Sequence, residues 1–309
     1  MTDPVRQIAD AVLYEGYILW PYRRSATKNQ QRWTFGGVYP PAHARAHPDD
    51  PSELSAQALV EDSPDVEVRV RFLQVVERSL VDAGGNRVDE LVVGGERYLA
   101  WDEATEREVV AAAGDTEIEV AAGSEREPLP DGAGTIVRSW EALRGAAGVA
   151  VALNDDRRFR LTVRIRNTTP WAGDGRQDAL RRTFCSTHAV MRARGDAFVS
   201  GTESDCESSG LWPVLVGEEG SRDTMLAAPI ILSDYPQIAP ESPGDLFDAT
   251  EIDKLLVLNV LALTPEEQAE MAASDPRARE ILDRCAALSP EQLMRLHGAM
   301  RELRPVSGE

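Results

Sequence analysis

Strict alternation of apolar and polar side chains is the main pattern of the central part of the chain. The run from Val66 to Phe72 and the run from Phe159 to Asn167 both carry apolar residues at every second position, with charged residues between them. This period of two is typical of half-buried strands. Hairpin turns fit at 82–86 and at 154–156, the second after an apolar strand over 148–153. These spacings predict an antiparallel sandwich or curved sheet rather than a βαβ fold.

Helical patterns bracket this β-rich body. Residues 3–15 show an apolar face, with Asp3 placed to cap the helix before a proline. From about residue 248 the apolar period changes to 3.6, and four capping residues are each followed by acids or by proline: Thr250, Thr264, Asp275 and Ser289. We therefore predict an α+β protein with a mainly antiparallel β body over residues 1–247. A tail of about four short helices follows over residues 248–309.

Three segments are less clearly patterned. Residues 39–65 hold five of the 19 prolines and predict a long loop with a short helix over 52–59. Residues 103–113 fit a helix or a strand. The junction 241–248 carries three carboxylates, which suit either a cation or a Pro/Gly hinge with helix-capping acids. Apolar stripes over 281–288 and 293–303 are typical of core, and a partner-binding face is the alternative.

Composition and charge narrow the classes of function. The 309 residues are 42% hydrophobic and 28% charged, which is globular composition, and the formal net charge is -19. Such an acidic chain is a poor candidate for binding nucleic acid or an anionic membrane. Its apolar runs are too short to span a bilayer. Three cysteines form no disulfide framework, so we expect a cytoplasmic protein.

Residues 23–32 reverse the charge of the chain, with four basic residues and no acidic one. Arg23, Arg24, Lys28 and Arg32 are followed by Trp33, which offers a stacking surface. One interpretation is a site for an anion or an acidic partner, since arginine forms bidentate pairs with carboxylates. The other is ion pairing with the chain's own excess of carboxylates, and both remain open.

Cys185, His188 and Cys206 are the candidate metal ligands. Thiolate and imidazole bind zinc, but a closed site needs four ligands. His43 and His47 would share a face only if their proline-flanked segment were helical. The alternative is a buried cysteine and a hydrogen-bonded histidine. A nucleophilic pair of Cys185 and His188 has little support, because on a strand these two side chains would point to opposite faces.

Two blocks carry a resemblance to a known family. These are LYEGYILWPYRRSATKNQQRWTFG, starting at Leu13, and the stretch from Trp212 to Thr264, which includes WPVLVGEEG, APIILSDYPQIAPESPGDLFDATEIDKLL and LALTPEE. They resemble uncharacterised actinobacterial proteins associated with gene clusters for high-affinity nickel–iron uptake hydrogenases. The resemblance implies a role in hydrogenase assembly or support, with a hydrogenase subunit or maturation factor as partner. It carries over no catalytic residue.

Two hypotheses of function follow. The first is a non-enzymatic accessory protein, such as a chaperone or scaffold, that binds another protein. Paired Cys-x-x-Cys motifs for nickel–iron ligation are missing from the sequence, so the chain is not itself expected to be a catalytic subunit or an iron–sulfur carrier. The second is a metal-dependent enzyme or metal carrier that uses Cys185, His188 and Cys206, with zinc as a possible cofactor.

Overall fold

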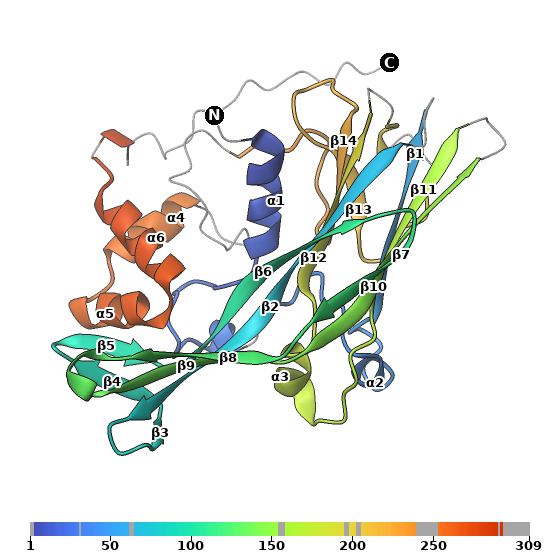
Figure 1. Cartoon of the computed structure of the whole chain (residues 1–309). Helices are drawn as coiled ribbons and strands as arrows, with labels where there is room; N and C mark the ends of the chain where they lie inside the picture. Colours follow the sequence, from blue (N-terminus) through green and yellow to red (C-terminus); the bar gives the residue numbers. More distant parts are fainter. Residues whose placement is uncertain are drawn as a thin grey trace.

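The computed structural model describes residues 3–30, 32–61, 65–153, 158–194, 198–201, 205–238, 253–289 and 291–292 (Figure 1). Its strands are β1 (Glu53–Val60), β2 (Val66–Asp82), β3 (Arg87–Val88), β4 (Glu90–Val93), β5 (Glu96–Leu99), β6 (Trp101–Ala111), β7 (Gly114–Val120), β8 (Gly123–Pro128), β9 (Gly134–Trp140), β10 (Leu143–Leu153), β11 (Phe159–Asn167), β12 (Cys185–Ala193), β13 (Trp212–Leu215) and β14 (Thr224–Ala228). Its α-helices are α1 (Pro4–Tyr14), α2 (Pro41–Ala44), α3 (Gly175–Leu180), α4 (Asp253–Leu261), α5 (Pro265–Ser274) and α6 (Pro276–Ala286).

All the paired strands are antiparallel neighbours, which confirms the predicted α+β class with a mainly antiparallel body. One sheet has the order β1-β11-β10-β7. The larger sheet has the order β13-β14-β12-β2-β9-β8, with β6 and β3 also paired to β2, and β4 and β5 form a separate hairpin. The predicted turn at 82–86 joins β2 to β3, where the Asp82 N–H donates to the Asn86 carbonyl at 2.9 Å.

The long strand β2 lies between two apolar cores. Its even-numbered residues Val68 and Phe72 face the smaller sheet, as the alternation predicted. Its odd-numbered residues Leu73 and Val75 join a second cluster formed with the N-terminal segment and the tail helices. Because both faces are covered there, burial becomes continuous from residue 70 to residue 76.

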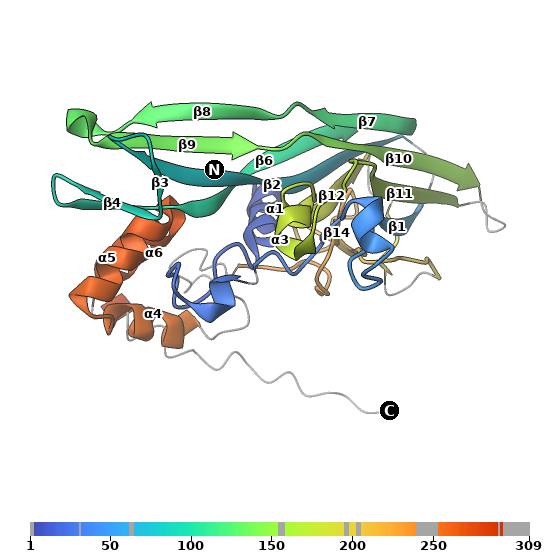
Figure 2. The same ribbon diagram turned by 90° about the horizontal axis from the view of Figure 1, so that it is seen from below.

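Helices cover the face of the large sheet that is turned away from the smaller sheet (Figure 2). Helix α1 packs on β12 and β2, and Asp3 caps it as predicted by accepting from the Val5 N–H at 3.0 Å. The three described tail helices pack on the N-terminal segment and on the β5–β6 region, with Leu256, Met271 and Ile281 buried. The apolar stripe of α6 is therefore core.

The prediction for residues 39–65 was wrong in one respect. Residues 52–59, expected to be helical, form most of β1, while α2 is the helix of that region. Strand β1 pairs in register with β11 and buries Leu54, Ala56 and Ala58 at alternate positions. Pairing with a distant strand overrides the local helix preference of this segment.

Other expectations are resolved or lie outside the described residues. Residues 103–113, which fitted either pattern, belong mainly to β6. The turn at 154–156, the junction 241–248 and the stripe over 293–303 lie outside the described part of the chain. Within that part, no helix is both long enough and apolar enough to cross a membrane.

Candidate functional site

The basic segment, residues 23–32, runs along the acidic tail helix α5. The Arg23 guanidinium lies 2.9 Å from a Glu267 carboxylate oxygen. The Arg24 backbone N–H donates to the Ser274 hydroxyl at 3.1 Å. Lys28 is exposed. Internal ion pairing with the chain's own acids, one of the two interpretations of this segment, thus accounts for Arg23.

Arg32 and Trp33, at the end of the basic segment, are buried instead. The Arg32 guanidinium carbon lies 3.7 Å from the ring centroid of Trp101 and 4.2 Å from that of Trp33, as in cation–π contacts. Arg32 donates from Nη1 to the Tyr17 carbonyl at 3.2 Å and from Nη2 to the Asp102 carbonyl at 2.6 Å. Burial lowers the pKa of Arg32 to about 10. The side chain therefore remains a cation at neutral pH.

A cavity of about 730 Å³ lies beside these residues, between the basic segment, β2, β3 and the start of β6. Its charged lining consists of Arg24, Arg32, Arg78, Arg87, Glu77, Asp89 and Asp102. Two ion pairs form between residues of this lining: Arg24 with Asp89 at 3.4 Å, and Arg87 with Glu77 at 2.5 Å. Asp102 is partly buried, and desolvation raises its pKa. The cavity can accept a ligand of ordinary small-molecule size.

One wall of this cavity could be predicted from the sequence, and the other could not. Arg32 stood out by the local charge reversal, and Trp33 stood out as a stacking surface beside it. Arg87, Trp101 and Asp102 come from strands far along the chain and carry no local signal of their own. Trp101 belongs to the apolar cluster under the tail, and its indole N–H donates a hydrogen bond to a buried carboxylate.

That buried carboxylate belongs to Asp275, which joins the wall of the cavity to the tail. It is 1% exposed and accepts hydrogen bonds from the Tyr17 hydroxyl at 2.7 Å and from Trp101 Nε1 at 3.2 Å. Its other oxygen caps α6 by accepting from the Arg277 backbone N–H at 2.8 Å. One carboxylate thus fixes the N-terminal segment, β6 and α6 together.

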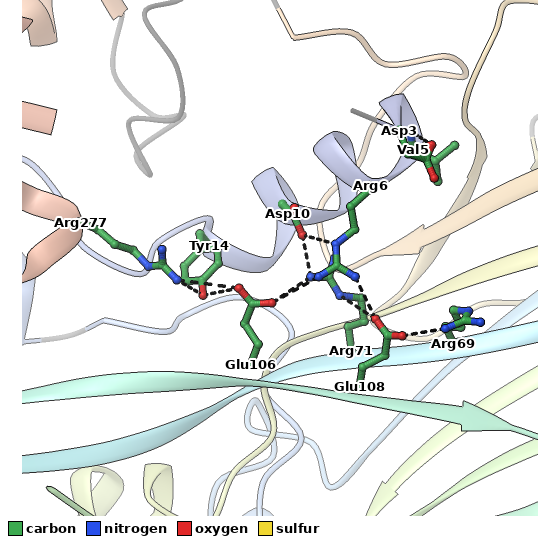
Figure 3. A network of polar contacts seen from close by, with 10 residues as sticks. All are labelled: Asp3, Val5, Arg6, Asp10, Tyr14, Arg69, Arg71, Glu106, Glu108 and Arg277. Atoms are coloured by element: carbon green, nitrogen blue, oxygen red, sulfur yellow. Dashed lines mark hydrogen bonds and ion pairs between the residues drawn. The ribbon is translucent and has the colours of Figure 1, made fainter. Parts of the chain in front are cut away.

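A second polar network anchors α1 to the large sheet (Figure 3). Arg71 of β2 is 2.6 Å from Asp10 of α1, and Arg6 lies 3.0 Å from Glu108 of β6. The Tyr14 hydroxyl donates to Glu106 at 2.6 Å, and Arg277 of α6 also contacts this hydroxyl. Cations and carboxylates alternate along this network, so its charges neutralise one another, and it has a structural role.

The candidate metal ligands are not brought together. Cys185 and His188 lie on β12, and Cys185 packs within the apolar cluster under the tail. Cys206 lies next to β1, where the neighbouring Glu207 N–H donates to Gln57 at 3.1 Å. In the part of the chain that the structure describes, no group of three or more His, Cys, Asp and Glu side chains is placed to hold a metal ion. The predicted zinc or other metal site is therefore not formed by these three residues.

The geometry of β12 also corrects the orientation expected for Cys185 and His188. A bulge at Ser186, whose φ is 50°, sets Cys185 opposite Leu73 and His188 opposite Arg71 on β2. Leu73 and Arg71 are two residues apart on β2, so their side chains lie on the same face of the sheet. Cys185 and His188, which lie opposite them, therefore point to that face as well. Burial raises the pKa of Cys185 to about 12, and burial with the charge of Arg71 lowers that of His188 to about 3. Both groups are neutral at pH 7, which does not favour a thiolate–imidazolium pair.

Comparison with known proteins gives no family assignment, since neither a protein-family model nor a curated protein matches this sequence.

Proposed function

We propose that this chain is a non-enzymatic accessory protein of the cytoplasm that acts by binding a partner protein. An acidic segment of that partner would enter the cavity beside the basic segment. The observation that supports this most directly is Arg32, a buried cation in the cavity wall. Because the chain as a whole carries a net charge of -19, most of its surface would repel an acidic partner. A local basic site would then fix the docking orientation.

The family resemblance suggests which partner to test. One of the two resembling blocks starts at Leu13 and includes Arg24, Arg32 and Trp33, three residues that line the cavity. The segment that carries the resemblance therefore also forms one wall of the proposed site. On this basis the proposed partner is a subunit or maturation factor of a nickel–iron hydrogenase. The chain would act as a chaperone or scaffold during assembly.

Affinity purification from cells that make the hydrogenase tests this proposal. The wild type is compared with R24A/R87A, which removes two lining cations, and with R160A/R166A, which removes two cations from β11. Arg160 and Arg166 each pair with one exposed aspartate, as Arg24 does, and the control removes the same total charge. We expect the wild type and the control to retain a hydrogenase or maturation protein, and R24A/R87A to retain much less of it.

The salt dependence of binding provides an independent check. Binding through charged residues at the rim of the cavity should weaken as the salt concentration rises, because the Debye length falls to about 8 Å at physiological ionic strength. Recovery of no hydrogenase-related protein by the wild type, while the hydrogenase is being made, would refute the proposal. Equal loss by both double variants would show that the cavity is not the docking site.

A further inference from the structure

We infer that the cavity binds a single carboxylate group, anchored by the open edge of the Arg32 guanidinium. This inference rests on the proposed binding role of the cavity and specifies its ligand. Two tryptophan rings pack against the guanidinium, with ring centroids 4.2 Å and 3.7 Å from its carbon, so a ligand would bind through the N–H groups at its edge. A guanidinium has five N–H groups. Two of the five donate to the Tyr17 and Asp102 carbonyls, which leaves three without an acceptor among the described residues.

The charge of Arg32 also lacks a direct counterion. No described carboxylate lies within 4.0 Å of its guanidinium, the distance that defines an ion pair. Asp102 is 3.8 Å from Arg181 and offers Arg32 its backbone carbonyl, while Asp275 is bound to Tyr17. The carboxylates of Asp102 and Asp275 attract this cation only from beyond ion-pair distance. An anion at its open edge would add a direct pair and offset part of the cost of burying the charge.

The balance of charges in the lining favours a monoanion. Four arginines and three carboxylates line the cavity, which leaves a net charge of +1 (four minus three). One carboxylate neutralises this charge, and its two oxygens match the planar fork of a guanidinium. A phosphate dianion would bring a second negative charge close to Glu77, Asp89 and Asp102. We therefore expect the site to prefer carboxylate over phosphate.

The remaining space indicates that the carboxylate belongs to a larger molecule. A cavity of about 730 Å³ far exceeds one carboxylate group, and Val88, Ala100 and Trp101 add apolar wall. The carboxylate can come from a free organic acid or from an acidic side chain of the partner protein. Both present the same group to Arg32, and they differ only in what fills the rest of the cavity.

Calorimetric titration of the full chain tests the inference with four probes. The probes are benzoate, inorganic phosphate, a short peptide with one internal glutamate and an amidated C-terminus, and the same peptide with glutamine in place of glutamate. We expect benzoate, the glutamate peptide, or both to bind more tightly than phosphate, and the glutamine peptide not to bind. Binding of benzoate alone assigns the site to a free organic acid, and preference for the glutamate peptide assigns it to a protein segment.

Two variants locate the binding. Arg32→Lys keeps the charge but removes the fork and should weaken carboxylate binding about tenfold or more. Because Arg32 is buried, that variant can lose its fold, so a second comparison uses exposed aspartates. Asp89→Asn removes a carboxylate from the lining and should tighten binding about twofold. Asp115→Asn, the matched control on β7, should leave binding unchanged, since Asp115 also pairs with one arginine but lies outside the lining.

The inference is overturned if no carboxylate probe binds, if phosphate binds more tightly, or if Asp89→Asn and Asp115→Asn behave alike. Its failure can be told apart from failure of the proposed function. If R24A/R87A loses the partner but no carboxylate probe binds, the proposed function stands and the carboxylate inference fails. If the probes bind as expected but partner capture is unaffected, the carboxylate inference stands and the proposed docking fails.

Discussion

Replacement of Asp275 by alanine should destabilise the protein far more than loss of an ordinary helix cap. Asp275 is the N-cap of α6, and its carboxylate also accepts from the Tyr17 hydroxyl and from Trp101 Nε1. Tyr17 is 3% exposed and Trp101 is 7% exposed, so neither donor gains water when the carboxylate is removed. Asp275→Ala therefore removes one cap and the carboxylate oxygen that accepts from two buried donors.

The size of the effect follows from these three contacts. Loss of a cap costs about 1 kcal/mol. Loss of the carboxylate acceptor of a buried donor costs about 1–3 kcal/mol, and two donors are affected. Neighbouring effects do not add fully, so we expect a total of about 3–5 kcal/mol in the free energy of unfolding. Asp275→Asn keeps one acceptor oxygen, which can serve either the cap or the two buried donors but not both, and should cost about 1–2 kcal/mol.

Thr264→Ala is the matched control on the preceding helix. Thr264 caps α5 through a reciprocal pair with Glu267, and these bonds are exposed to solvent, so its loss should cost about 1 kcal/mol. Urea unfolding followed by tryptophan fluorescence and far-ultraviolet circular dichroism measures all three variants. If Asp275→Ala falls within about 1 kcal/mol of Thr264→Ala, the buried contacts contribute little and the reasoning is wrong.

Three further predictions concern single residues elsewhere in the fold. Burial lowers the pKa of His188 to about 3 from its usual 6.5, so the unfolded chain binds a proton that the folded chain does not. Stability should therefore fall by about 1.4 kcal/mol per pH unit as pH drops from 6.5 towards 3, and urea unfolding of His188→Gln at several pH values should show a shallower dependence. Cys206 should react quickly with a thiol reagent in the native protein while Cys185, buried with its pKa raised to about 12, reacts slowly; a fast phase that survives in Cys206→Ser would contradict this. Gly145→Ala should cost about 1–3 kcal/mol or more, because a Cβ there would lie 2.3 Å from a backbone carbonyl oxygen and 2.7 Å from a buried phenyl ring. Gly148→Ala, on the same strand, should cost less when the thermal unfolding of the two variants is compared, since its Cβ would meet the movable tip of a carboxylate.

The parts of the fold that could be predicted from the sequence are those whose pairing is local. The pair β10 and β11 is close in sequence, and the alternation in β11 matches its buried residues Leu161, Val163 and Ile165. Strand β1 was missed because its partner β11 lies about 100 residues away, and its alanines hide the period of two. Small residues give a weak hydrophobic signal and also suit a helix.

The candidate site could be predicted only in part for a related reason. The charge reversal over 23–32 drew attention to Arg32, but its burial could not be predicted, because arginine is usually exposed. The covering ring of Trp101 and the bonded carbonyl of Asp102 lie about 70 residues away. Only the folded sheet places them beside the basic segment, so charge alone could not identify the cavity.

The basic segment thus has two roles, contact with the tail at one end and lining of the cavity at the other, although its charge pattern is uniform. Arg23 pairs with Glu267 of α5, so its replacement tests how firmly the tail is held. Arg32, at the other end, donates to the Tyr17 and Asp102 carbonyls and lines the cavity, so its replacement tests ligand binding. Arg24 belongs to both groups, because its backbone meets Ser274 while its side chain reaches the cavity. A variant that removes Arg23 and Arg24 together would mix a change in tail stability with a change in the site. The segment must therefore be tested one position at a time, with stability and binding measured on the same protein.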